Sequence, residues 1–531
     1  MRKLFVLALL AATASANELS YRSLQSGPNG TTTPLYNHGI HGEGQIIAFL
    51  DTGVDYTSCF FIEPDGSRPP VNTRVDQDNV DLTRRKIVAY DFLYSCDQYP
   101  NATGCDDPNN PNAYDNQGHG THAAASAAGD RVTPIGHDYG DAIATGAKLI
   151  VQDAGYIGGD KCAQRPGIGC PVNITPILDQ AYRQGARIHS NSWGDAQGST
   201  FNPPTANYPQ SAHDVDAFVW SHPDMLVVFN TGNFGSAGTA PPSSVSAPGA
   251  AKNTLQVGGT RTASHYADDA LSSFTLFGPT RDGRIKPDVV GPAEVLAGDT
   301  SLVSNGQTCS MTFQPGTSWA SPTIAGAAAL VRQYYTDGYY PTGVATPANR
   351  MIPSAALLKA TIIAAARRVP YLLTSTGQVE TKAVPSNEQG FGFPVLDDAL
   401  YFPGDAAKLR VQDVPLASGL AEGQSATMGL SVKQGTPLKI VLVWTDPPGV
   451  PLVNDLDLRV TDPAGNVFLG NGQSDHVNNV EAVSISQPLA GIYTISVSAA
   501  HIGLGLRQSY ALVVTGDIAD PQPVRARAAH H

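Results

Sequence analysis

Short apolar segments alternate with helical segments through the first half of this chain, and this alternation limits its fold more than any other feature. The predicted elements are, in chain order, strand 44–50, strand 148–152, helix 176–184, strand 186–190, helix 213–221, strand 225–230 and strand 254–257. Continuous apolar strands are typical of sheets that are covered on both faces. The pattern therefore predicts an α/β fold, with a mostly parallel sheet and helices on both faces.

Other parts of this first region carry weaker patterns. Residues 17–38 are polar and contain Gly, Pro and Thr, so we expect an irregular segment there. Residues 58–115 are rich in Pro and Asn and predict surface loops, with a hairpin around Ile87–Phe92. The segment Ala325–Tyr335 is rich in Ala, Leu and Val and predicts a buried helix.

The character of the sequence changes after about residue 403. Helical patterns stop, and short alternating segments follow at 426–432, 438–444, 456–460, 482–486, 492–498 and 510–515. Turn residues separate these segments at near-regular spacing, which predicts an all-β sandwich or jelly-roll-like domain. We expect a first domain over residues 40–402, this β domain over 403–516, and a flexible tail over 517–531.

Charge and targeting signals describe the compartment. The 531 residues include 33 basic and 46 acidic side chains, a net charge of −13, which argues against nucleic acid or an anionic membrane as a general partner. Residues 1–16 have a basic start, a short apolar run and a small-residue end, and they predict a secretory signal peptide cleaved after Ala16. No later segment is apolar for long enough to span a membrane. We expect a secreted monomer with a short N-terminal segment over residues 17–39.

Cysteine usage fits an oxidising compartment. The six cysteines are Cys59, Cys96, Cys105, Cys162, Cys170 and Cys309. Two close pairs, Cys96–Cys105 and Cys162–Cys170, would each close one loop, which leaves Cys59–Cys309. Six cysteines allow 15 pairings, so other connectivities stay open.

Three residues are candidates for nucleophilic catalysis, and each has a simpler structural explanation. Asp51 ends the predicted strand 44–50, where α/β proteins place their sites, but an Asx turn would also use it. His119 lies between two glycines at the start of an Ala-rich helix, where a structural histidine is the alternative. Ser318 precedes the predicted helix of residues 325–335, and a simple helix cap is the alternative.

The motifs around these residues resemble those of one family. Asp51-Thr-Gly, His119-Gly-Thr-His and Gly316-Thr-Ser-Trp-Ala-Ser-Pro322 occur in the order Asp, His, Ser, which is the order found in subtilisin. The chain resembles the subtilisin-like serine proteases at all three blocks, over roughly residues 38–400. The resemblance implies that Ser318 is the nucleophile, that His119 is the general base and acid, and that Asp51 orients the imidazole.

The resemblance also implies roles for the neighbouring loops. Asn233 maps to the side chain that stabilises the oxyanion, together with the backbone N–H of Ser318. The predicted substrate-binding residues are Ser192, Trp193, Gly194, Thr231 and Gly232. These loops lack an acidic cluster, so we expect an apolar or aromatic preference in protein and peptide substrates. Trp319 stands where the family usually has Met, and residues 17–39 are much shorter than the family's usual pro-segment.

The β domain resembles the C-terminal sandwich of some secreted subtilases and carries a candidate metal site. Asp455 and Asp457 lie two apart in a predicted strand and share one face. They could bind structural Ca²⁺ with backbone oxygens and with Asp446 or Asp462, although a solvated acidic face explains them equally well.

The sequence therefore predicts a secreted serine endopeptidase. Two alternatives stay open. One is an inactive protease-like scaffold that acts as an extracellular binding protein. The other is an esterase of the GDSL or α/β-hydrolase type, against which the residue order and the lack of a Gly-x-Ser-x-Gly motif both count.

Overall fold

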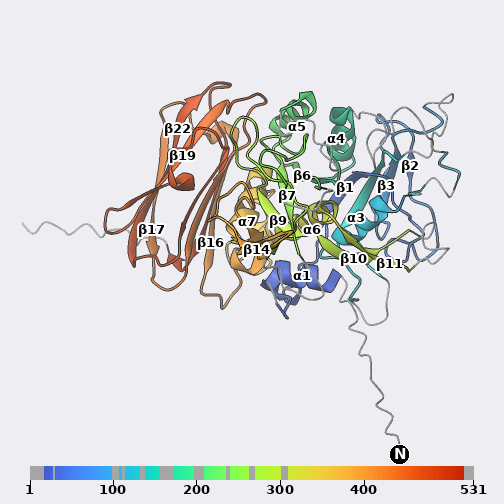
Figure 1. Ribbon diagram of the computed structural model, residues 1–531, viewed down its shortest axis with the longest axis horizontal. Coiled ribbons are helices and arrows are strands. Elements are labelled where there is room, and N and C mark those ends of the chain that lie inside the picture. Colours follow the sequence, from blue (N-terminus) through green and yellow to red (C-terminus); the bar gives the residue numbers. More distant parts are fainter. Residues whose placement is uncertain are drawn as a thin grey trace, which may run out of the picture.

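The fold is built around one large sheet. The computed structural model describes residues 17–27, 30–98, 107–110, 114–115, 117–131, 138–155, 173–195, 208–234, 240–261, 270–300 and 309–519. The sheet has 11 strands in the order β14-β13-β8-β7-β6-β5-β1-β4-β3-β2, with β9 paired to β7 (Figure 1). Its strands are β1 Ile46–Asp51, β2 Val71–Asn72, β3 Ile87–Phe92, β4 Lys148–Asp153, β5 Ile188–Asn191, β6 Leu226–Asn230, β7 Leu255–Thr260, β8 Ala270–Leu271, β9 Val289–Pro292, β13 Tyr371–Thr374 and β14 Gly377–Glu380.

Helices cover both faces of this sheet. They are α1 Asn17–Ser26, α2 Pro34–Asn37, α3 His119–Ala128, α4 Ile174–Arg183, α5 Gln210–Ser221, α6 Thr317–Thr336 and α7 Ala355–Ala364. Successive residues of β1 point to opposite faces: Ile47 and Phe49 share a buried cluster with α3 and α6, whereas Ala48 and Leu50 share one with α4 and α5. The neighbours of β1 and of β6 are all parallel. The predicted α/β fold is confirmed.

Segment 87–92 corrects one expectation. It does not form a hairpin but is strand β3, which pairs in parallel with both β2 and β4. All six of its residues are buried. The error has a physical cause: a short apolar run among loops does not reveal its partner, which here lies about 60 residues further along the chain at β4.

The structure of the N-terminal segment differs from the irregular segment that we expected there. Residues 17–38 are not irregular, because α1 and α2 occupy much of this range. Helix α1 packs against α6 and against β10 Glu294–Gly298, with Tyr21 and Leu24 buried in the main core. Its first residue is also held, since the Asn17 side-chain amide donates to the carbonyl of Ala125 at 3.3 Å and of Gly140 at 3.1 Å. The segment is therefore an integral part of the described core.

The C-terminal part is a sandwich of two antiparallel sheets, as predicted. One sheet has the order β16-β23-β18-β21 and the other β20-β19-β22-β17-β24. The strands are β16 Lys408–Val414, β17 Ser425–Val432, β18 Leu438–Val443, β19 Asn454–Thr461, β20 Val467–Leu469, β21 Val480–Ile485, β22 Gly491–Ile502, β23 Tyr510–Gly516 and β24 Ile518–Ala519. A separate buried cluster that contains Trp444 fills the space between the sheets. β16 is absent from the predicted strands, because its alternation is weak.

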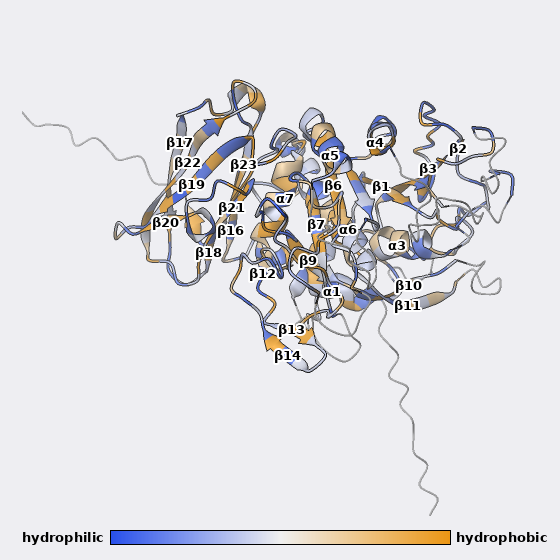
Figure 2. Cartoon of the chain, turned by 45° about the horizontal axis from the view of Figure 1, so that its top comes forward, coloured by the Kyte–Doolittle hydropathy of each residue, from blue (hydrophilic) through white to orange (hydrophobic). Residues whose placement is uncertain are grey.

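The sandwich lies directly against α7, which packs on β18 and β23 of the four-stranded sheet (Figure 1). Ile440 and Leu442 of β18 point into the sandwich, whereas Val441 and Val443 join the main core of the first domain. Hydrophobic residues accordingly run through β7 and β9 and continue into the sandwich (Figure 2). The four-stranded sheet thus contributes one face to the main core and the other face to the separate cluster inside the sandwich.

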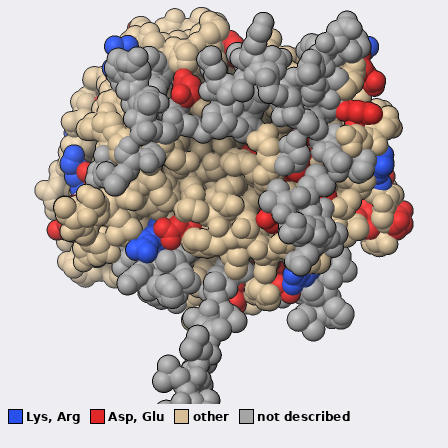
Figure 3. Space-filling view, turned by 45° about the vertical axis from the view of Figure 1, so that its right-hand side comes forward, with Lys and Arg blue, Asp and Glu red and all other residues tan. Residues whose placement is uncertain are grey.

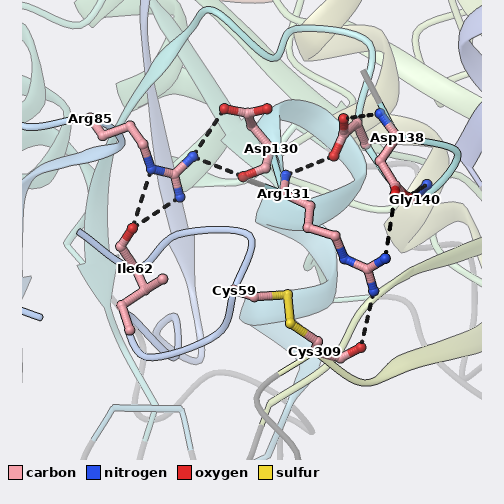
Figure 4. The surroundings of a disulfide bond; sticks show 9 residues. Cys59, Ile62, Arg85, Asp130, Arg131, Asp138, Gly140 and Cys309 are labelled. Atoms are coloured by element: carbon pink, nitrogen blue, oxygen red, sulfur yellow. Dashed lines mark hydrogen bonds and ion pairs between the residues drawn. A yellow bond between two sulfur atoms is a disulfide. The ribbon is translucent and has the colours of Figure 1, made fainter. Parts of the chain in front are cut away.

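One disulfide bond ties two distant segments together. Cys59 and Cys309 are joined, which confirms this predicted pair (Figure 4). Arg131 lies beside the bond, and its guanidinium donates to the carbonyl of Cys309 at 3.5 Å and pairs with Asp138 at 3.4 Å. Cys96 is also disulfide-bonded, but Cys105, Cys162 and Cys170 lie outside the described residues, so their pairing stays a prediction.

Two surface properties complete the description. No helix among the described residues combines the length and the apolar character that a membrane span needs. On the face drawn in Figure 3, the coloured Lys and Arg side chains stand apart from one another and do not gather into a basic patch.

Candidate active site

Asp51 is positioned by the end of the central strand β1. It is 4% exposed, at the carboxyl edge of the sheet between β4 and β5. One carboxylate oxygen, Oδ1, accepts a hydrogen bond from the Thr52 backbone N–H at 2.7 Å. The same oxygen lies 2.7 Å from Nδ1 of His119. The strand thus fixes a buried carboxylate that contacts the imidazole.

His119 is the first residue of α3, and its side chain remains 30% exposed. Burial works against the charged imidazolium. The charge and hydrogen bond of Asp51, helped by the charge of Asp115, nevertheless raise the pKa of His119 above its ordinary value. With Nδ1 turned toward Asp51, the other ring nitrogen is available to exchange a proton with a second group.

Asp115 holds the turn that presents His119, and the sequence motifs did not single it out. Its carboxylate is 1% exposed and accepts from the N–H groups of Gly118 at 2.8 Å and Thr121 at 2.7 Å. It also accepts from the Thr52 hydroxyl at 2.8 Å, which ties the turn to the end of β1. Burial raises the pKa of Asp115 to about 6. The sequence signal that could have pointed to Asp115 is its position shortly before the glycine-flanked start of a helix.

The glycines around His119 permit a close approach of two chain segments. Gly118 has a φ of +81°, which a side chain would disfavour. At Gly120, a β-carbon would lie 2.0 Å from the carbonyl oxygen of Gly53, so only glycine fits. The turn after β1 and the start of α3 are therefore in direct backbone contact.

Ser318 is the second residue of α6 and is 6% exposed. Its hydroxyl donates to the carbonyl of Ser192 at 3.3 Å, and the Ser192 hydroxyl donates to the carbonyl of Ser318 at 2.7 Å. Helices α3 and α6 pack against each other (Figure 1). The bonds of Ser318 to Ser192, which follows β5, place it at the carboxyl edge of the sheet, where Asp51 and His119 also lie. Among the described residues no hydrogen bond joins the Ser318 hydroxyl to His119, so proton transfer would require the hydroxyl to turn away from Ser192.

Asn233 follows β6 and lies against the turn that carries Ser318. Its Oδ1 accepts from the N–H of Thr317 at 2.8 Å and from the Thr317 hydroxyl at 2.9 Å. These two bonds fix the orientation of the amide and leave its nitrogen as a free donor, because no acceptor for it occurs among the described residues. That geometry suits a side chain that would stabilise an oxyanion.

The predicted substrate-binding residues lie around this edge, but two of them face the core. Trp193 is 6% exposed, and its indole packs on Phe229 with the ring centroids 5.3 Å apart. Thr231 is fully buried. Gly232 accepts from the Thr317 hydroxyl at 3.1 Å through its carbonyl. Ser192 and Gly194 continue from β5, so these residues can offer a substrate only their backbone edge.

Trp319 joins the two helices of the site. Its ring lies 4.8 Å from the ring of His119 and 4.3 Å from the ring of His122, centroid to centroid. The indole is 5% exposed. Burial lowers the pKa of His122 to about 3, so this histidine is neutral. The motif showed Trp319 only as a departure from the family, and its contacts appear once α3 and α6 pack together.

The candidate metal site in the sandwich gains a residue that the sequence did not reveal. Ligand atoms of Asp455, Asp457 and His476 all lie within 4.8 Å of one another. Nδ1 of His476 is 2.6 Å from Oδ2 of Asp455, and the other oxygen of Asp455 is buried with no hydrogen-bond partner among the residues that the structure describes. A buried carboxylate oxygen without a donor fits a bound cation, so the donor set is compatible with a metal ion.

Two further residues that we expected at this metal site are engaged elsewhere. Asp446 forms a buried ion pair with Lys252 and accepts from the N–H of Asn454 at 2.7 Å. Asp462 closes a turn by accepting from the N–H and side chain of Asn466, both at 2.8 Å. The expectation that either would join Asp455 and Asp457 is wrong, because the ligand atoms that lie together are those of Asp455, Asp457 and His476.

Comparison with known proteins identifies relatives. The chain is similar to "Serine protease/ABC transporter B family protein tagA" of Dictyostelium discoideum, with 25% identity over 612 residues that cover 94% of this chain and 32% of the relative. It thus spans about a third of the length of that relative. A thermophilic serine proteinase of Bacillus sp. (strain AK1) is 26% identical over 324 residues, which cover 61% of each protein.

Solved structures give a coarser similarity. A serine protease of Aeromonas sobria aligns over 95% of this chain and 94% of its own, with 15% identity and a TM-score of 0.44. The match to a family is more extensive, since residues 42–392 match the description "Subtilase family". This range includes Asp51, His119 and Ser318 and covers well over half of the chain. The protein therefore belongs to the subtilase family of serine proteases.

Proposed function

We propose that this protein is a secreted serine endopeptidase that hydrolyses peptide bonds through Asp51, His119 and Ser318. The single observation that carries the proposal is the 2.7 Å contact between Asp51 and His119, at the sheet edge where Ser318 begins α6. A serine hydroxyl is a weak nucleophile near neutral pH, so it needs an adjacent base. An oriented, partly exposed imidazole is such a base.

The proposed reaction has two stages. Ser318 Oγ attacks the carbonyl carbon of the substrate while His119 takes the hydroxyl proton, and His119 then gives that proton to the leaving amine. Water attacks the resulting acyl-enzyme by the same route in reverse. Asn233 Nδ2 and the backbone N–H of Ser318 would stabilise the oxyanion in both stages.

An activity test separates this proposal from its alternatives. Purified protein and a Ser318→Ala variant would be incubated with casein and with a serine-directed fluorophosphonate probe. We expect casein cleavage and labelling from the parent protein, with both lost in the variant. A folded parent protein that gives neither signal would favour the inactive binding scaffold, and ester hydrolysis without casein cleavage would favour an esterase.

Substrate preference follows from the backbone edge around Ser192–Gly194. Because the described part of this edge presents no acidic cluster, we propose an apolar or aromatic preference at the residue before the scissile bond. A peptide library would test this, and cleavage confined to paired basic residues would contradict it. Peptide and protein substrates are the proposed partners, and the protein would act as a monomer, which sedimentation velocity would check.

Secretion is supported by the leader-like residues 1–16, which lie outside the described residues, and by disulfide-bonded Cys59, Cys96 and Cys309. Expression with the full leader, followed by N-terminal sequencing of the protein in the medium, tests this. We expect the mature chain to begin at Asn17. A product retained in the cytoplasm with Met1 in place would contradict it.

Asp455 and Asp457 would bind a structural calcium ion, with His476 displaced or retained as a neighbour. We expect added Ca²⁺ to raise the melting temperature of the parent protein and to leave a variant with Asp455→Asn and Asp457→Asn unchanged. Asp462→Asn is the matched control, because this carboxylate belongs to a separate turn. Stabilisation by Zn²⁺ but not by Ca²⁺ would assign the site to a transition metal through His476.

A further inference from the structure

The buried position of the Trp319 indole is not explained by a hydrogen bond from its ring nitrogen. Its Nε1–H is buried, and no hydrogen-bond acceptor for it occurs in the part of the chain that the structure describes. Burying an unsatisfied donor is unfavourable, and a phenylalanine ring would avoid that cost. A ring nitrogen without a partner at this place indicates that the indole serves through its faces and edges.

Those faces and edges contact two histidines in different states. The rings of Trp319 and His119 are tilted by 43° with centroids 4.8 Å apart, whereas the ring of His122 meets the indole at 68° and 4.3 Å. Indole attracts a neighbouring cation more strongly than the other aromatic side chains do. Trp319 therefore lies between His119, which can take up a proton, and His122, which is neutral and packs against the indole.

We propose that Trp319 is a positioning residue that holds the His119 ring and stabilises its protonated form through a cation–π contact. The proposal rests on the proposed function, in which His119 becomes an imidazolium when it takes the proton of Ser318. Asp51 fixes the imidazole at Nδ1 alone, so rotation about that contact must be limited by a second group. The indole is placed to do this, and its neighbour in sequence is the nucleophile itself.

The remaining groups around His119 define what the experiment must hold constant. Among the described residues, the titratable groups that act on His119 are Asp51 at the end of β1, Asp115 before α3, and His122 on α3. None of the three forms a hydrogen bond with Trp319. Substitution of Trp319 therefore leaves their hydrogen bonds in place and changes the contact between the indole and the imidazole.

Three variants separate the cation–π contact from simple packing. Trp319→Phe keeps an aromatic ring and removes the unsatisfied N–H, Trp319→Leu removes the π system, and Trp319→Met restores the residue usual in the family. We expect the pH midpoint of the acid limb of kcat/KM to fall by about half a unit in Trp319→Leu and Trp319→Met, and by less in Trp319→Phe. We also expect Trp319→Phe to melt at or above the temperature of the parent protein.

A direct titration makes the inference independent of activity. In a Ser318→Ala background, the His119 pKa would be measured by NMR, with and without Trp319→Leu. We expect the same downward shift of about half a unit. An unchanged His119 pKa, together with an unchanged acid limb in all three variants, would overturn the proposal. A parent protein that resists the fluorophosphonate probe, but whose His119 pKa shifts as expected, would overturn only the proposed function.

Discussion

The carboxylate of Asp51 contacts the imidazole of His119, and the protonation of this imidazole would set the pH dependence of the proposed activity. Asp51 is almost fully buried and bonds to Thr52 and His119 through the same oxygen. The carboxylate is therefore in direct contact with the imidazole. Desolvation would lower the pKa of His119, but the charge and hydrogen bond of Asp51, together with the charge of Asp115, outweigh it.

This contact predicts the acid limb of the activity profile. In the proposed mechanism His119 must be neutral to accept the Ser318 proton, so we expect activity to rise with pH as His119 loses its proton. Since the pKa of His119 is raised from its ordinary value of 6.5, we expect the midpoint of kcat/KM above pH 6.5. Asp51→Asn should move this midpoint down and lower kcat by about 10⁴-fold, by analogy with the corresponding change in another triad protease.

The control for this prediction is a carboxylate of similar burial that does not touch the site. Asp462 lies in a turn of the sandwich, and hydrogen bonds from Asn466 lower its pKa, so it stays charged over the relevant pH range. We expect Asp462→Asn to leave the acid limb of kcat/KM unchanged. An acid limb that moves equally in Asp51→Asn and Asp462→Asn would mean that overall charge, and not the contact between Asp51 and His119, sets the profile of the proposed activity.

Helix α1 contributes to the core although its sequence has no obvious apolar periodicity. Its 10 residues are mostly polar, and only Tyr21 and Leu24 contribute apolar side chains to the core. Gln25 adds a polar link, since its side-chain oxygen accepts from the N–H of Leu35 at 3.1 Å. The helix is stabilised by the surface it covers, because an isolated helix of this length is marginal in water.

Two truncations and one substitution test this role. A chain that begins at Asn17 should fold, whereas one that begins at Gly27 should lose α1 and become unstable or insoluble. Leu24→Ala should lower the free energy of unfolding by about 2–5 kcal/mol, because Leu24 is fully buried. Chemical denaturation provides the measurement, and Arg22→Ala on the partly exposed side of α1 is the matched control. Equal stability of Leu24→Ala and Arg22→Ala would contradict this role.

Helices and strands with a clear hydrophobic pattern could be predicted from the sequence. Those that are stabilised mainly by distant segments of the chain could not. Strands such as β1 and β6 are continuous apolar runs, and the sandwich strands alternate, so both types were visible in the sequence. Strand β3 was misread because its partner β4 is distant, and α1 was missed because its apolar residues are too few. The loop residue His476 reaches Asp455 only through the folding of β19 to β21, so no spacing pointed to it.

At the candidate active site, the sequence motifs predicted which residues lie together but not how their side chains are oriented. The motifs placed Asp51, His119 and Ser318 on three separate elements, and the fold brings these elements to one edge. The hydrogen bond of Ser318 to Ser192, the support from Asp115 and the ring contacts of Trp319 had no counterpart in the motifs. Each depends on side-chain orientation after α3 and α6 have packed, which a linear pattern does not encode.

The whole molecule is joined by a shared core and by a buried ion pair. Val441 and Val443 of the sandwich pack into the main core beside α7. Lys252, in the loop before β7, pairs with Asp446, in the loop after β18, and both side chains are fully buried. Lys252 also donates to the carbonyl of Pro447 at 2.6 Å. Because neither part can satisfy these groups alone, we expect the first domain and the sandwich to unfold together.

The Lys252–Asp446 pair gives the sharpest test of this coupling. Asp446→Ala leaves a buried ammonium without its carboxylate, so we expect it to lower the free energy of unfolding by about 3–5 kcal/mol. A double variant with Lys252→Met and Asp446→Leu removes both charges and should recover much of that loss. Guanidinium unfolding would be followed by tryptophan fluorescence in the parent protein and in a Trp444→Phe variant, because the other three tryptophans lie in the first domain and the difference between the two signals reports on the sandwich. Residual activity of the proposed peptidase would report on the first domain. Coincident transitions in the parent protein, shifted together in Asp446→Ala, would establish that the sandwich stabilises the catalytic part; a loss of the sandwich signal while activity persists would show that the two parts are independent.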